Sequence, residues 1–151
     1  MLLSHGAIRV KSCCLAIMIY SNNLIEALRE ELQQFGEMLG RFDDAEAYTT
    51  QDSPERSRAT AIAILAQQEV VSLTVRRRQE AQRCAASHLG LEETSKLADI
   101  IPSLSLERRV LVKALMDENK DLSSRVQQRG ELERQLPRRS LHLLQDCFDV
   151  A

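Results

Sequence analysis

The stretch LIEALREELQQFGEMLGRF, residues 24–42, decides the fold class of this 151-residue chain. Its large apolar residues are separated alternately by three and four positions, which is the spacing of a coiled-coil seam on an α-helix. They are Ile25, Leu28, Leu32, Phe35, Leu39 and Phe42. The pattern predicts a helix from about Asn22 to Tyr48, with Ser21 or Asn22 capping its first amide groups.

Three prolines divide the remainder into further helical segments, because proline lacks the amide donor that a helix interior needs. They are Pro54, Pro102 and Pro137. The sequence SPE at 53–55 predicts a helix start with Ser53 as its cap. We expect this second helix to run to about His88, where Gly90 takes the left-handed conformation and Leu91 folds back.

The second helix carries apolar residues on more than one face, which indicates two neighbouring elements. These residues are Ile62, Ala63, Leu65, Ala66, Val70, Val71, Leu73 and Val75. Downstream, residues 90–102 predict a short helix that ends before the second proline. Ser103 or Ser105 then caps a long helix that reaches about Leu136, where the third proline ends it.

The last part of the chain, LVKALMDENKDLSSRV (111–126) and RRSLHLLQDCF (138–148), keeps the helical rhythm. Its predicted seam residues are Leu111, Leu115, Leu122 and Val126, with Asn119 among them, and then Leu141, Leu144 and Phe148. The predicted fold is all-α: an elongated antiparallel helical bundle or coiled-coil hairpin of three long helices plus short helices. Each long helix measures roughly 40 to 50 Å.

Composition supports this fold and excludes several classes of function. Hydrophobic residues make up 44% of the chain, aromatic residues 3%, and there is no tryptophan, so aliphatic side chains form the core. A net charge of -2 argues against a dedicated nucleic-acid binder. The four cysteines form no CxxC or Cys/His spacing, which favours reduced thiols in a cytosolic protein and no bound metal.

Charge is distributed unevenly between the first two predicted helices. Residues 22–55 hold nine acidic and two basic residues, whereas residues 56–88 hold six arginines and two glutamates. If the two helices are neighbours, each offsets the field of the other, and this pattern helps to set which helix lies beside which.

The N-terminal segment contains the apolar run CCLAIMIY at 13–20, which is too short to span a bilayer. No small-residue cleavage site follows it, so a secretory signal is not favoured. We expect a loose extension over residues 1–20, a helical bundle domain over 21–136 and a C-terminal amphipathic segment over 137–151. A native start at Met18 is a hypothesis that mass spectrometry of the native protein would settle.

No motif in the sequence predicts catalysis, so we expect no enzyme, no catalytic residue, no cofactor and no metal. The three histidines lie far apart, and the five glycines are scattered singly, without a phosphate-binding loop. The run RRRQEAQR at 76–83 is the best nucleic-acid candidate. Its first three arginines point in different directions on a helix and no aromatic residue interleaves them, so a solvated face is the favoured interpretation.

The chain resembles the FlgN family of bacterial flagellar export chaperones over about residues 22–148. Three stretches carry the resemblance: the second helix with its Leu-Gly turn, residues 111–126, and the C-terminal apolar segment 138–148. In the second stretch Asn119 and Leu122 match the family's Asn and following Leu. Met116 occupies the position where the family usually has another Asn.

The resemblance implies a cytoplasmic bacterial chaperone without catalytic activity. Proteins of this family bind the C-terminal helices of the hook-filament junction proteins FlgK and FlgL, keep them from polymerising, and deliver them to the type III export machinery. The client-binding residues are then expected on the seam of 111–126 and at Leu141, Leu144 and Phe148. We expect this C-terminal segment to fold or reorient on client binding, although permanent packing on the bundle is the alternative.

The sequence allows two environments for Asn119 and more than one function for the chain. Asn119 either fixes register and partner choice as a buried polar residue in a helical seam, or it faces water beside Glu118 and Lys120. The alternative function is a self-associating coiled-coil scaffold without a client, in which the surplus apolar face of the second helix makes a homodimer. A salt-sensitive nucleic-acid interaction through residues 76–83 is a third reading.

Overall fold

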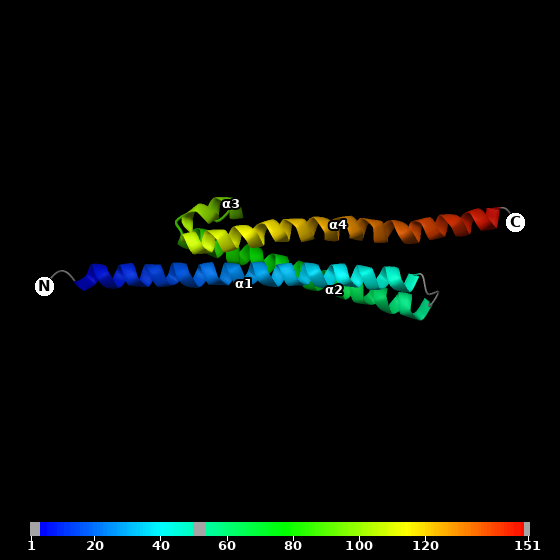
Figure 1. Cartoon of the computed structure of the whole chain (residues 1–151), viewed down its shortest axis with the longest axis horizontal. Coiled ribbons are helices and arrows are strands. Elements are labelled where there is room, and N and C mark those ends of the chain that lie inside the picture. The colour runs from blue at the N-terminus through cyan, green and yellow to red at the C-terminus, as the bar shows by residue number, and fades with distance from the viewer. Residues whose placement is uncertain (1–3, 50–53, 150–151) are drawn as a thin grey trace.

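The computed structural model describes the backbone of residues 4–49 and 54–149, and the side chains of residues 13–47 and 54–132. Within these ranges the chain is helical and contains no strand, which confirms the all-α prediction. The long helices are α1 (Ser4–Thr49), α2 (Pro54–His88) and α4 (Leu106–Asp149) (Figure 1). The short helix α3 (Leu97–Ile100) and the 3-10 helix η1 (Ile101–Ser103) connect α2 to α4.

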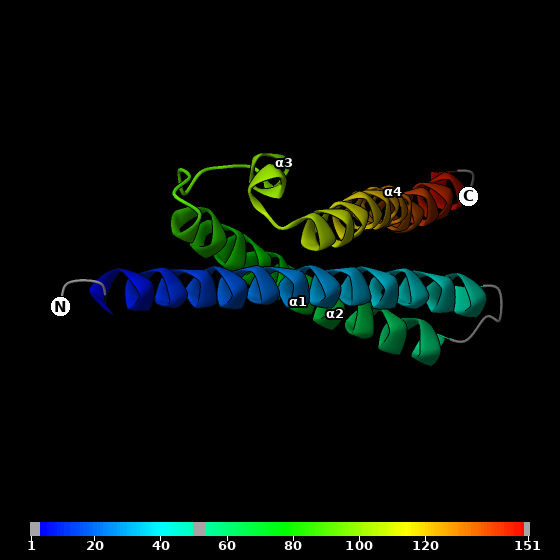
Figure 2. The same cartoon turned by 60° about the vertical axis from the view of Figure 1, so that its left-hand side comes forward.

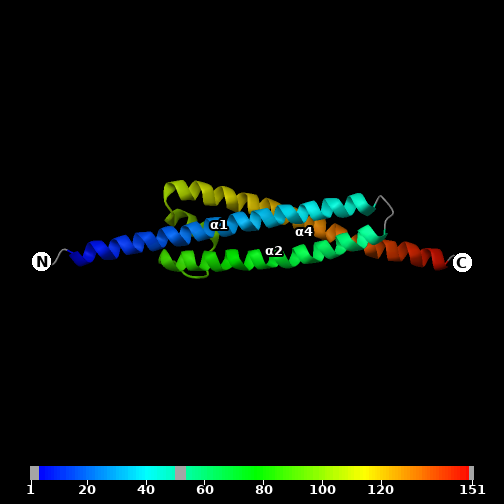
Figure 3. The same cartoon turned by 90° about the horizontal axis from the view of Figure 1, so that it is seen from below.

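The three long helices run up, down and up along one axis. α1 and α2 form the expected antiparallel hairpin, and α4 packs mainly on α1 (Figure 3). Because two reversals of direction separate α1 from α4, these two helices run parallel to each other. The N-terminal end of α1 and the C-terminal end of α4 project at opposite ends of the elongated molecule (Figure 1).

α1 is the central helix, and its most buried line is shifted from the predicted seam. The buried residues along it are Ser21, Leu24, Leu28, Glu31, Phe35, Met38 and Phe42. Leu32 and Leu39, predicted in the seam, are only half-buried. The shift arises because α1 contacts both α2 and α4, so the positions between these two contact faces are the best shielded from solvent.

The apolar core lies at one end of the bundle, where α3 and η1 fold over the long helices (Figure 2). Its buried members come from the three long helices, α3 and the residue after η1: Leu24, Ile25, Leu28, Ala85, Ala86, Ile100, Leu104, Val112 and Leu115. Burying large aliphatic side chains contributes about 1.5–3 kcal/mol each, so this end anchors the fold.

The predicted stop signal of α2 is confirmed in detail. Gly90 has a φ of 72°, a backbone angle that residues with a Cβ rarely adopt. The Leu91 amide donates to the Ala86 carbonyl at 2.9 Å, and the Gly90 amide donates to the Ser87 carbonyl at 3.2 Å. These two bonds make a Schellman ending, and Leu91 packs against the core.

The outer ends of α1 and α4 differ from the prediction. α1 begins at Ser4 instead of about Asn22, so the backbone of residues 4–20 is helical and not a loose extension. No proline or glycine lies between Ala7 and Phe35, and the Ser21 hydroxyl donates to the Ile17 carbonyl at 2.7 Å instead of capping a helix. Residues 1–3 lie outside the described residues.

The prediction that Pro137 ends the last helix is also wrong, because α4 continues to Asp149. A proline removes one intrahelical hydrogen bond, but the turns on either side keep theirs. The predicted helix boundaries around the second proline agree better with the structure. α3 ends at Ile100, before Pro102, which lies in η1, and Ser105 directly precedes α4.

Candidate protein-binding site

The predicted seam of α4 lies against α1. Leu115 and Asn119 are buried, and Leu111, Leu122 and Val126 are half-buried. Val112, which sequence reasoning did not select, is fully buried and belongs to the core. Leu115 and Asn119 are therefore shielded by the chain itself, and a partner meets this seam only where the half-buried residues remain exposed. Their role in binding a partner stays a prediction.

Asn119 is the most informative residue of this seam. It is only 6% exposed, so the alternative in which it faces water is wrong. Its Nδ2 donates to the Leu28 carbonyl of α1 at 3.0 Å. Its Oδ1 is buried and accepts no hydrogen bond from any residue that the structure describes. A buried acceptor without a hydrogen bond lowers the free energy of unfolding, so Asn119 is expected to destabilise the fold relative to an apolar residue.

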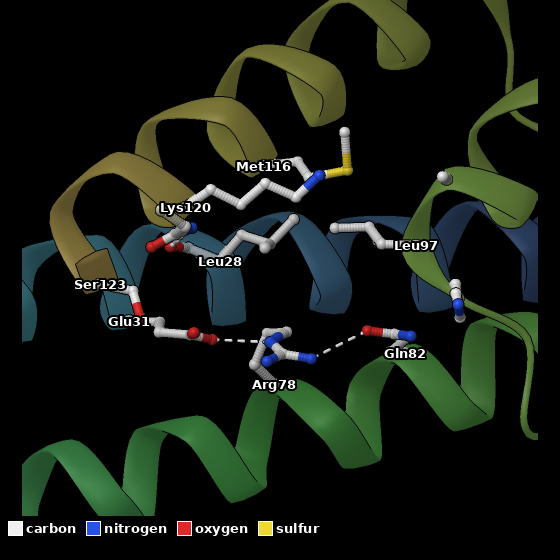
Figure 4. A pocket seen from close by; sticks show the side chains of 11 residues that line it. Leu28, Glu31, Arg78, Gln82, Leu97, Met116, Lys120 and Ser123 are labelled. Carbon is white, nitrogen blue, oxygen red and sulfur yellow. Dashed lines mark hydrogen bonds and ion pairs between the residues drawn. The ribbon is translucent and has the colours of Figure 1, made fainter. Parts of the chain in front are cut away.

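A pocket of about 360 Å³ opens beside Asn119, between all four α-helices (Figure 4). Leu28, Leu97 and Met116 supply its apolar wall, and the paired charges of Glu31 and Arg78 lie opposite Met116. The other lining residues are Gln82, Lys96, Ala98, Asn119, Lys120 and Ser123. The pocket is large enough to admit a side chain from a partner.

The floor of this pocket is a hydrogen-bonded chain across α1 and α2. Arg78 Nε donates to Glu31 Oε2 at 2.7 Å, and Arg78 Nη1 donates to Gln82 Oε1 at 2.9 Å. Gln82 Nε2 in turn donates to the Ser95 carbonyl at 2.9 Å, which ties the loop before α3 to α2. The Glu31 side chain is only 6% exposed, so its charge depends on Arg78 for compensation.

The predicted pairing of the acidic and basic segments is confirmed. Arg77 pairs with Glu30 at 2.9 Å beside the Arg78–Glu31 pair, and both pairs join α2 to α1. Arg83 pairs with Glu80 at 2.7 Å and with Glu93 at 3.1 Å. Three of the four arginines in the run 76–83 are thus engaged within the chain, which weakens the nucleic-acid reading.

The Arg83 cluster also shifts the protonation of its members. The hydrogen bond from Arg83 holds the pKa of the exposed Glu80 carboxyl below its usual range, and the same bond raises the pKa of the guanidinium. Desolvation raises the pKa of the Cys84 thiol, and its hydrogen bond to Glu80 adds to this shift. Cys84 is therefore less readily ionised than an ordinary thiol, which does not favour a nucleophilic role.

The part of the chain that the structure describes contains free thiols but no candidate metal site. No group of three or more His, Cys, Asp or Glu side chains is placed there to hold a metal ion. Cys13, Cys14 and Cys84 are free thiols. None of the described helices has a stretch long and apolar enough to cross a membrane.

The C-terminal residues of the predicted site are placed by their backbone alone. Leu141, Leu144 and Phe148 lie in α4, and their side chains are outside the described residues. The end of α4 that carries them extends past the C-terminal end of α1 and the N-terminal end of α2 (Figures 1 and 3). This end of the helix is therefore separate from the seam around Asn119.

Comparison with known proteins adds no identity. No family model matches the chain, no curated protein is significantly similar to it, and no solved structure matches it.

Proposed function

We propose that this chain is a cytoplasmic bacterial export chaperone of the FlgN type. Its clients are the C-terminal helices of the hook-filament junction proteins FlgK and FlgL. By covering these helices it prevents premature polymerisation, and it then delivers the subunits to the type III export machinery. No bond is made or broken in this function, and none of the residues described above is assigned a catalytic role.

One observation supports this proposal most: α4 continues as a helix beyond the α1–α2 hairpin (Figure 3). The sequence of this end places Leu141, Leu144 and Phe148 on one side of the helix. A helix that runs free of its own bundle and carries an apolar side can pair with a client helix whose own coiled-coil face would otherwise self-associate.

Titration calorimetry against C-terminal helical fragments of FlgK-type and FlgL-type proteins from the same organism tests the proposal. We expect a 1:1 complex with a dissociation constant on the order of 1 µM or lower. Deletion of residues 138–151 is expected to abolish binding. The deleted chain keeps the helix content of the remainder, because the core cluster lies between Leu24 and Leu115.

A matched control uses the opposite end of the same helix. Leu106 and Val110 are 76% and 67% exposed near the start of α4, so replacing both by alanine removes apolar surface without disturbing the core. We expect this double variant to bind as the unmodified chain does. Full binding after deletion of 138–151 would contradict the proposed client site. No heat with either fragment would contradict the proposed function and favour the self-associating scaffold.

A further inference from the structure

Over its first three-fifths α2 buries polar residues and exposes several large aliphatic residues to solvent, while Ile64, Val71 and Val75 are half-buried. The buried residues in its first three-fifths are Thr60, Gln67 and Thr74, spaced by one heptad. Gln67 Nε2 donates to Gln34 Oε1 of α1 at 2.7 Å, so this contact is partly hydrogen-bonded. Large aliphatic residues of α2 are left exposed instead: Ile62 at 62%, Leu65 at 63%, Val70 at 41% and Leu73 at 47%.

These exposed residues form one row, which we call the α2 apolar face: Ala59, Ile62, Leu65, Ala66, Val70 and Leu73. At 100° per residue they lie on one side of the helix, away from the Thr60–Gln67–Thr74 line. α2 lies along one edge of the molecule, and the helices that pack on it are α1 and, near its C-terminal end, α3 (Figure 3). A contiguous exposed apolar row of this kind marks an interaction surface.

We propose that the α2 apolar face binds the same face of a second copy, with the two α2 helices antiparallel and Ala66 at the twofold axis. In this register each residue meets the one equally far on the other side of Ala66. Ile62 and Val70 are both four positions away, and Ala59 and Leu73 are both seven positions away. Apolar residues therefore meet apolar residues at these four positions, whereas Leu65 is level with Gln67 at the edge of the contact. The small side chain at the axis lets the helices approach closely.

The charges at the ends of the face are complementary in the same register. Glu55 lies eleven positions before Ala66 and Arg76 lies ten positions after it, so Glu55 of one copy is roughly 1.5 Å along the axis from Arg76 of the other. The two Glu69 side chains are offset by roughly 9 Å along the pair. A parallel pair would instead bring Glu55, Glu69 and Arg76 each against its own copy, which is unfavourable.

A single helix pair buries little surface, which sets the expected strength of the dimer. Interfaces below about 1,200 Å² are weak, so we expect a monomer–dimer equilibrium with a dissociation constant on the order of 10 µM. Sedimentation equilibrium of the full chain between about 1 µM and about 200 µM should then show mass rising from monomer to dimer. This experiment uses no client, so its outcome is independent of the proposed chaperone function.

The substitution Ile62→Glu places a charge on the face at a site that is exposed in the single copy, so the fold is retained. We expect it to weaken dimerisation at least tenfold. Val110→Glu is the matched control, because Val110 is equally exposed on α4 and lies outside the face. Equal loss of dimer with both substitutions, or no loss with Ile62→Glu, would overturn the proposal.

Cysteine cross-linking tests the antiparallel register, in a chain whose four native cysteines are replaced by serine. Ala66→Cys is expected to form a disulfide with its own copy, because the two positions meet at the axis. Ala59→Cys is expected to form none, because the two copies of this position are roughly 21 Å apart. A parallel pair would cross-link at both positions and refute the arrangement.

A chain that stays monomeric at every concentration would also refute the proposal. If Ile62→Glu then weakened the binding of a FlgK-type fragment, the α2 apolar face would belong to a client instead of a second copy.

Discussion

Replacing Asn119 by leucine is expected to stabilise the protein. The wild-type side chain makes one hydrogen bond, to the Leu28 carbonyl at 3.0 Å, and leaves Oδ1 buried without a partner among the described residues. The substitution loses a bond worth about 1 kcal/mol but removes an unpaired acceptor that costs about 1–3 kcal/mol. The Leu28 carbonyl lies inside α1, where it also accepts the intrahelical hydrogen bond from the backbone amide four residues later, so the substitution leaves it paired.

Leucine also adds apolar burial, and the pocket of about 360 Å³ beside Asn119 gives room for its larger side chain. Together these effects predict a gain of about 2 kcal/mol in the free energy of unfolding. For a chain of this size the gain raises Tm by roughly 4–8 °C. Urea unfolding followed by circular dichroism at 222 nm measures the free energy, and a thermal scan measures Tm.

Two further variants make the result interpretable. Ser124→Leu adds the same side chain at an exposed position of α4 and is expected to change stability by no more than about 0.5 kcal/mol. Asn119→Asp places a carboxylate beside a carbonyl in a buried site, and we expect a loss of about 3 kcal/mol at neutral pH. If Asn119→Leu is less stable than the unmodified chain, the inference that this amide costs stability is refuted. If its client preference is also unchanged, Asn119 has no specificity role.

Two other predictions follow from the ion pairs and the turn. Arg78→Ala leaves the buried Glu31 carboxylate without its cation and should lower the free energy of unfolding by about 3 kcal/mol. Arg77→Ala breaks an exposed ion pair and should lower it by less than about 1 kcal/mol. Equal losses for the two variants in urea unfolding would refute this distinction between a buried and an exposed pair. Gly90→Ala should lower the free energy of unfolding by about 1 kcal/mol, because a φ of 72° strains a residue with a Cβ. Gly36→Ala, in open space on α1, should raise it by about 0.5 kcal/mol, because alanine favours the helix more than glycine does. A rise for both variants in urea unfolding would contradict the inference that the backbone at Gly90 requires glycine.

Local signals in the sequence predicted α2 closely. Its start at Pro54 and its end at His88 depend on a proline at the first helical position and a glycine at the end, and both act through the backbone of a few neighbouring residues. The start of α1 and the end of α4 were predicted wrongly, because a serine and a single proline do not by themselves interrupt a helix. A serine caps a helix only if the preceding residues are not helical, and the Ser21 hydroxyl instead bonds back to the Ile17 carbonyl.

The site was predicted less completely than the fold. Sequence periodicity selected Leu115 and Asn119 in the α4 seam, and both are buried there. It missed Val112, and it could not show that Glu31, a charged residue, lies on the best-shielded line of α1. The only sequence signal for Glu31 was the opposite charge of the segments that contain it and Arg78, and that signal identified neighbouring helices without identifying the buried pair.

The sequence by itself determined the helical class, the bounds of α2 and the pairing of the acidic helix with the basic one. These depend on local backbone chemistry and on net charge, which need no knowledge of which face points inward. Only the tertiary structure decided which side of each helix is buried. α1 contacts two helices, so its shielded line lies between them. α2 contacts α1 through Thr60, Gln67 and Thr74 and leaves Ile62, Leu65 and Leu73 exposed. Burial follows from the position of neighbouring helices, and periodicity alone does not specify it.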